Sequence, residues 1–172
     1  GTERMFFTRM IMKDMDPSQI VGNAKEYTLT HYDGTQRKVF VTDVETDFPE
    51  GKLIVSLTDT SGIITKCNQA FVDMSGYTHD ELVGQPHSIL RHPDLPKAAF
   101  ADLWATVQAG KKWRGYVKNL RKDGGYYWVH AVVVPNIRAG KIIGYTSVRR
   151  KPSRTKIDAI IPVYADLKAK EA

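Results

Sequence analysis

The chain has 172 residues and a formal net charge of +6, with 42% hydrophobic and 26% charged residues. This length and composition are typical of one globular domain with extensions. The single cysteine, Cys67, excludes an internal disulfide framework and any metal site built from several cysteines.

The expected location is the cytoplasm. One cysteine fits a reducing compartment, no apolar run approaches the roughly 20 residues of a membrane span, and no segment has the form of a signal peptide. Because the chain begins at Gly1 rather than at a methionine, we expect a piece of a longer protein. It could therefore be the cytosolic part of a membrane-anchored receptor.

The charge is unevenly distributed. Residues 111–156 hold 13 lysines and arginines and a single acid, Asp123. One interpretation is an anionic ligand or an anionic partner surface. The other is a solvated sheet whose lysines protect its edges.

Residues 1–47 are predicted to form an N-terminal extension. Met5, Phe6, Met12 and Met15 could share one face of a short helix that ends before Asp16-Pro17. A polar loop would follow, up to about residue 36. The extension is expected to act as a cap, packed on the domain or on a second copy, unless part of it is disordered.

Short strands follow the extension. Residues 38–42, 53–58 and 63–67 have strand composition, and the last two would form a hairpin. Asn68 is expected to cap a helix that ends at Gly76. Thr78 and Glu81 form a capping box that would begin a second short helix.

Residues 84–110 combine polar groups with an amphipathic helix, which suits a pocket for a flat, charged cofactor. Asp94 is expected to cap this helix, with Pro96 in its first turn and its end near Ala109. Its apolar positions fall at helical spacing: Ala99, Phe100, Leu103, Trp104 and Val107.

Three strands are predicted over residues 113–121, 126–134 and 142–149, with Pro135 ending the second. Together with the first hairpin they predict an α+β domain, a five-stranded antiparallel sheet with helices on one side. A helix over residues 155–169, kinked at Pro162, would follow. It is either an output connector or a helix docked on its own domain.

Three segments resemble the flavin-binding PAS domains of bacterial aerotaxis receptors. They contain Ser-Gly-Tyr (75–77), Arg-His-Pro-Asp (91–94) and Trp-Arg-Gly-Tyr-Val-Lys-Asn (113–119). The resemblance runs from about Phe48 to Leu167. It implies a PAS sensor domain at 48–151 and a signalling linker helix at 152–172.

The resemblance also implies the function of an FAD-binding redox sensor that reports to a chemotaxis-type output module. The expected partners are FAD, a second copy in a homodimer, and a downstream signalling domain of the same or an associated chemoreceptor. In that family the Arg-His-x-Asp segment supports FAD binding, which maps onto Arg91, His92 and Asp94. In similar FAD-binding PAS proteins, including a nitrogen-fixation regulator, the tryptophan and asparagine that match Trp113 and Asn119 lie at the flavin.

Each candidate also has a structural interpretation. Trp113 could stack on a ring or belong to the core, and Asn119 could bind the flavin imide edge or face outward. Arg91 could hold a pyrophosphate or pair with Asp94. His92 could bind the cofactor, orient Asp94 or cap a turn.

Four further residues complete the candidate site. His87 is either a ligand of the cofactor or a residue that shapes its loop. Phe100 and Trp104 would line the pocket from the helix. Arg149 is the candidate reporter of flavin state, because similar sensors carry a polar residue near that place.

Departures from related families narrow the chemistry. No cysteine occurs in residues 84–110, which argues against light-driven adduct formation, and no histidine occurs in residues 95–110. Haem binding therefore remains an alternative only through His87 or His92, and FMN or a cofactor-free interaction module are the others.

An enzyme is not expected, because the chain has no glycine-rich phosphate loop and no nucleophile beside a base. No recognition-helix motif points to nucleic acid.

Overall fold

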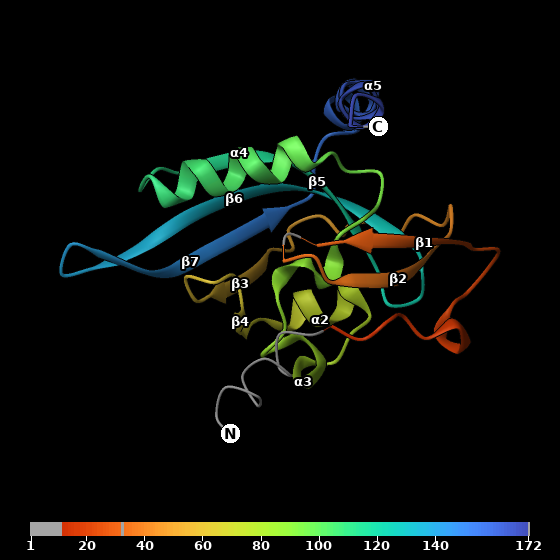
Figure 1. The fold of residues 1–172 in the computed structure, drawn as a ribbon, viewed down its shortest axis with the longest axis horizontal. Helices are drawn as coiled ribbons and strands as arrows, with labels where there is room; N and C mark the ends of the chain where they lie inside the picture. The colour runs from red at the N-terminus through yellow and green to blue at the C-terminus, as the bar shows by residue number, and fades with distance from the viewer. Residues whose placement is uncertain (1–11, 32, 172) are drawn as a thin grey trace.

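The computed structural model describes residues 12–31 and 33–171. Seven strands form two sheets (Figure 1). A two-stranded sheet pairs β1 (Lys25–Thr30) with β2 (Gln36–Val41). The five-stranded sheet has the order β4-β3-β7-β6-β5 and is antiparallel throughout. Its strands are β3 (Ile54–Thr58), β4 (Ile64–Cys67), β5 (Trp113–Leu120), β6 (Tyr126–Arg138) and β7 (Lys141–Arg150).

Between the β3–β4 hairpin and β5 lie four helical segments, which are α2 (Gln69–Ser75), α3 (His79–Leu82), the 3-10 helix η2 (His87–Leu90) and α4 (Lys97–Gln108). The N-terminal region contains a short 3-10 helix, η1 (Pro17–Gln19), and the chain ends with α5 (Arg154–Ala169). Within the described chain, no helix has both the length and the hydrophobicity needed to cross a lipid bilayer.

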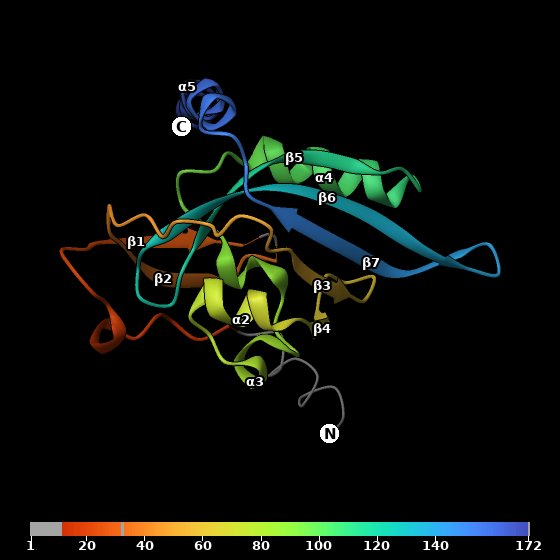
Figure 2. The same cartoon turned by 180° about the vertical axis from the view of Figure 1, so that it is seen from behind.

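The two faces of the large sheet have different partners. Buried residues of α2, α3, η2 and α4 form one core with the inner-face positions of β6, which include Tyr127, Val129 and Ala131. The helix α5 packs on the outer face, where Ile157 and Trp128 are buried together. Figures 1 and 2 show α5 on the opposite side of the sheet from α2 and α3. The predicted α+β architecture is thus confirmed.

Local capping signals were read correctly. The Asn68 side chain accepts the Phe71 N–H at the start of α2, and Gly76 ends this helix with a left-handed φ of 78°. The capping box is also present, because Thr78 and Glu81 each bond the other's backbone N–H.

The N-terminal extension differs from the prediction. Met5 and Phe6 lie outside the described residues, and residues 12–16 have no regular secondary structure instead of a helix. The stretch expected to be a loop up to residue 36 contains β1, because Leu29 packs with Val39 and Leu120 in a small separate core. The Asp33-Gly34 pair forms the turn, with Gly34 at a φ of 86°.

The strand predicted to stop at Pro135 continues to Arg138. The partner strand β5 pairs with β6 only as far as Val133, so Pro135 lies where β6 has a single neighbour. A proline lacks only the donor, and it is tolerated where one side of a strand is unpaired.

The predicted helix cap at Asp94 is wrong. No side chain caps α4 at Pro96, and the Lys97 N–H instead donates to the Glu171 carboxylate beyond α5. Asp94 points to Lys118 on β5, with a 2.8 Å ion pair. This pairing joins positions 24 residues apart, so no local pattern could have indicated it.

Candidate functional site

The inner face of the large sheet carries a buried cation. Arg149 on β7 is 2% exposed. Its Nη1 donates to His87 Nε2 at 2.9 Å, and its Nη2 donates to Ser56 Oγ at 2.6 Å. The guanidinium also lies over the Phe71 ring, 4.6 Å from the centroid. Among the described residues, no carboxylate pairs with Arg149.

Burial changes the titration of this cluster. It lowers the pKa of Arg149 to about 10, so the side chain still carries its charge at neutral pH. Burial and the Arg149 charge lower the pKa of His87 to about 3, so its imidazole is neutral. A neutral His87 can accept the Arg149 donor, and the cluster therefore holds one uncompensated positive charge.

Two uncharged groups flank the cation. Asn119 on β5 is 4% exposed, and Tyr127 opposite it on β6 is fully buried. The Asn119 Nδ2, the Tyr127 hydroxyl and the Arg149 Nε have no hydrogen-bond partner within the described part of the chain. Burial raises the pKa of Tyr127 to about 12, so its hydroxyl stays protonated. Buried polar groups are normally bonded, and three free donors in one place indicate a missing partner.

The two predicted tryptophans belong to the walls of this region. Trp113 is 7% exposed in the main core, and its Nε1–H donates to Asp102 on α4 at 2.9 Å. Its ring lies so close to Gly115 that a Cβ there would be 2.3 Å from it. Trp104 meets the Tyr145 ring edge-on at 5.6 Å. These contacts give both rings a structural role.

The Arg-His-Pro-Asp segment does not form one cluster, because its side chains diverge. Arg91 lies over the Phe100 ring at 4.9 Å, and its backbone pairs with Asn119 in an isolated bridge. It makes no ion pair with Asp94, which answers the structural alternative. Arg91 therefore lies next to the buried cluster, at the edge strand β5.

His92 is 1% exposed and shapes its turn: its Nδ1 accepts the Asp94 backbone N–H at 3.0 Å. Because Nδ1 accepts, the ring proton is on Nε2, which is buried without a partner among the described residues. Burial is the first cause of its lowered pKa.

Ser56, Phe71 and Tyr127 were missed as site residues. They reach the cluster through strand pairing and helix packing: Ser56 pairs with Ser147 on β7, and Tyr127 pairs with Asn119. The period-two alternation that places Asn119 and Trp113 on one face also placed Tyr127 on the inner side, had the register been known.

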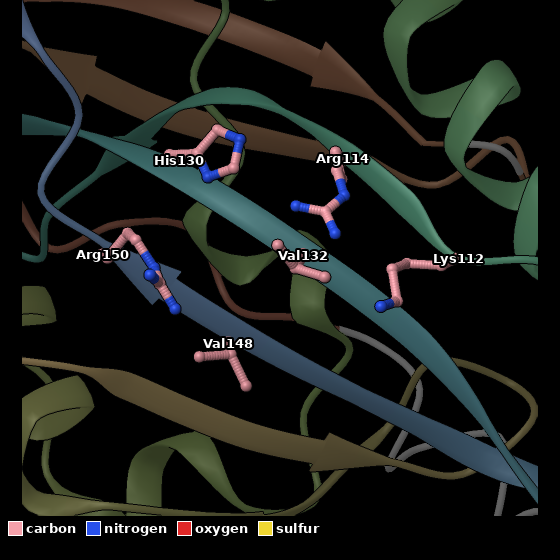
Figure 3. A pocket seen from close by; sticks show the side chains of 6 residues that line it. All are labelled: Lys112, Arg114, His130, Val132, Val148 and Arg150. Carbon is pink, nitrogen blue, oxygen red and sulfur yellow. The ribbon is translucent and has the colours of Figure 1, made fainter.

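The outer face of the same sheet holds a basic surface (Figure 3). Exposed Lys112, Arg114 and Arg150 surround half-buried valines in a shallow cavity of about 350 Å³. No ion pair involves these three cations within the described residues, and Arg114 and Arg150 contribute to lowering the pKa of His130 beside them. The basic half of the sequence thus forms a sheet face. The cavity is lined by Lys112, Arg114, His130, Val132, Val148 and Arg150.

Curated relatives match most of this chain. It is 48% identical over 130 residues to the aerotaxis receptor of Escherichia coli, covering 76% of this chain and 26% of that protein. It is 30% identical over 113 residues to the nitrogen fixation regulatory protein of Klebsiella pneumoniae, covering 65% and 22%. The chain thus spans about a quarter of the length of these relatives.

A solved structure of the Aureochrome1 LOV domain in its light state superposes with a TM-score of 0.58 at 22% identity, covering 63% of this chain and 88% of that one. This likeness concerns the fold. The family model described as PAS fold matches residues 64–149, which include the β4 strand, the helical segments and most of β7. With this match and the 48% identical relative, the chain belongs to the PAS-fold family.

Proposed function

We propose that this PAS domain binds FAD on the inner face of its sheet and reports the redox state of the flavin. The carrying observation is the cluster of buried donors without partners on Arg149, Asn119 and Tyr127. The imide edge of a flavin presents carbonyl oxygens and ring nitrogens, which such donors could satisfy. A bound flavin would supply reversible electron transfer.

The protein groups would hold and tune the ring. Arg149 is a charged donor that stays protonated at neutral pH, and it favours any increase of negative charge near it. Asn119 offers both a donor and an acceptor, so it can fix the orientation of an imide. The 48% identity to an aerotaxis receptor supports a sensory role over an enzymatic one.

The geometry disfavours the haem alternative. Iron would need an imidazole lone pair, but His87 Nε2 accepts from Arg149 at 2.9 Å. His92 accepts a backbone N–H through Nδ1, so its Nε2 carries the proton. Both histidines would have to give up these arrangements before they could bind iron.

We also propose a route for the signal. Neighbouring residues of β6 face opposite sides of the sheet: Tyr127 joins the buried cluster, and Trp128 stacks on Tyr164 of α5. A change in hydrogen bonding at the inner face could shift β6 and alter the docking of α5. In this proposal residues 48–151 are the sensor, 1–47 the cap and 152–172 the linker to a downstream signalling domain, within a homodimer.

The test is the variant Asn119→Ala, with Asn136→Ala as a matched control on the distal part of β6. The Asn136 side chain accepts from Thr146 and lies outside the cluster. Asn119→Ala should lower FAD occupancy and shift the reduction potential of the flavin, whereas the control should match the wild type. Unchanged occupancy and potential in Asn119→Ala would refute the assignment.

A further inference from the structure

The β1–β2 hairpin brings basic side chains to the segment that carries Arg91. Arg37 on β2 is 3% exposed, and its guanidinium donates to the Lys13 and Ile89 carbonyls and to the Tyr77 hydroxyl. All three acceptors are neutral. The bond to Ile89, two residues before Arg91, fastens the hairpin to η2.

His31 stands at the turn of the same hairpin. Its backbone N–H donates to the Thr35 carbonyl at 2.8 Å, which closes the turn. Its Nε2 is buried without a hydrogen-bond partner in the described chain. Burial is the main cause that lowers the pKa of His31, followed by the charges of Arg91 and Arg37, while Asp33 opposes them. The three basic residues are thus close enough to act on one another.

Arg91 completes this group. Its Nε is also buried without a partner among the described residues, and its guanidinium contacts the Phe100 ring rather than an acid. Glu171 is the acid that favours its charge through space, but that carboxylate already accepts the Lys97 N–H and pairs with Lys168. Two arginines and a histidine therefore face one another with no carboxylate partner on either arginine across the described residues.

A phosphate group is the ligand chemistry that these donors fit. Guanidinium groups bind phosphate oxygens through parallel N–H donors, and a neutral histidine can add one more. The position relative to the buried cluster is suitable, because the Arg91 backbone pairs directly with Asn119. A dinucleotide cofactor has its phosphates at a distance from its ring and would need such a second contact.

We propose that His31, Arg37 and Arg91 form a phosphate-binding subsite, so that the N-terminal hairpin closes over the pyrophosphate of the dinucleotide. This inference rests on the proposed flavin function and extends it to an element outside the matched family region, residues 64–149. The hairpin then determines that the chain binds FAD in preference to flavins without a phosphate.

The test compares the affinities of FAD and riboflavin, because riboflavin carries the same ring without phosphate. Titrations followed by flavin fluorescence would use the full chain, cleared of cofactor, and its variants His31→Ala, Arg91→Gln and Arg91→Lys. The control Lys25→Gln removes an exposed cation from the same hairpin. Arg37 is left intact, since its three bonds hold the hairpin in place.

We expect His31→Ala to weaken FAD binding about tenfold and Arg91→Gln by about 10- to 100-fold, as for lost hydrogen bonds to a charged group. Arg91→Lys should lie between Arg91→Gln and the wild type, because it keeps the charge without the fork. Riboflavin affinity should change by less than about twofold in every variant, at roughly the error of such measurements.

Equal losses for FAD and riboflavin, or no loss for FAD in His31→Ala and Arg91→Gln, would overturn the subsite. A wild-type chain that binds riboflavin as tightly as FAD would also overturn it while leaving the flavin function intact. Failure of the wild type to bind either ligand would instead refute the proposed function. Far-ultraviolet circular dichroism of each variant would identify any loss of fold, and Arg91→Lys then supplies the decisive comparison.

Discussion

At the residue scale, Arg149 is costly to the empty protein. A buried charge without a counter-charge loses hydration that two neutral acceptors and one aromatic ring restore only in part. Residues that serve binding rather than folding often reduce stability in this way. The guanidinium therefore gives a direct way to separate function from fold.

The variant Arg149→Met should raise the free energy of unfolding of the cofactor-free chain by about 1 kcal/mol or more. Ser56 and His87 can then bond each other, since they lie 3.2 Å apart. The same variant should weaken binding of both FAD and riboflavin by about 10- to 100-fold. Urea unfolding and flavin titration are the measurements, with Arg138→Met in the exposed β6–β7 turn as control. Unchanged flavin affinity would contradict this role of Arg149.

The titration of His87 predicts a pH dependence. An unfolded histidine takes up its proton near its ordinary pKa of about 6.5, whereas the pKa of folded His87 is about 3. Between these values the unfolded chain binds more protons, so stability falls as the pH drops from about 6.5 toward about 3. The contribution is fully present above the higher value.

In the variant His87→Gln this loss should be smaller, by up to about 1.4 kcal/mol per pH unit within that window. The glutamine oxygen can still accept from Arg149, which limits structural damage. Urea unfolding of the cofactor-free chain at several pH values measures the slope. If both proteins show the same slope, the imidazole is not held neutral as described.

Sequence patterns reached part of the site at this scale. Asn119 and Arg149 were found because the family resemblance and strand alternation mark them. Ser56 and Tyr127 carry no such mark, since a serine or tyrosine in a strand is ordinary until pairing across the sheet shows its neighbours. Asp94 was given a local role, but Lys118 on a distant strand takes its side chain.

At the element scale, α5 is joined to the sheet by one aromatic residue in particular. The Tyr164 ring stacks on Trp128, and its hydroxyl donates to the Tyr116 carbonyl at 2.7 Å. The helix also carries exposed Ile161 and Val163, at 44% and 49%. Its docking therefore depends on a few contacts on one side, which suits an element that must respond to the sheet.

The variant Tyr164→Ala should loosen this docking by about 2 kcal/mol, the sum expected for an aromatic pair and a hydrogen bond. Backbone amides of α5 should then exchange hydrogen for deuterium more than about tenfold faster, while those of β6 stay protected. Val163→Ala on the exposed side serves as the control. Equal exchange in α5 of the two variants would show that Tyr164 does not hold the helix.

Elements with strong local signals were predictable, and those that depend on distant partners were less so. The boundaries of α2 and α3 follow from Asn68, Gly76 and the capping box. The hairpin β1–β2 was missed because its burial rests mainly on Leu29 and on Leu120 from another sheet. The length of β6 was underestimated because Pro135 was judged without knowing where β5 ends.

At the scale of the whole molecule, the sheet separates a polar, buried inner face from an outer face that carries α5 and a basic surface (Figures 1 and 3). The proposed cofactor lies on the first, and the proposed output lies on the second. The hairpin β1–β2 and Arg91 extend the inner site toward the edge strand. Together these features describe a sensor with one site and one exit.

The most direct test of this account is the absorbance spectrum of the purified chain, followed by denaturation and chromatography of whatever it releases. We predict the spectrum of an oxidised flavin, which dithionite bleaches and air restores, and a released chromophore that co-elutes with FAD. A protein isolated without cofactor should acquire the same spectrum on addition of FAD. A Soret band, or a colourless protein that binds neither FAD nor riboflavin, would contradict the proposal.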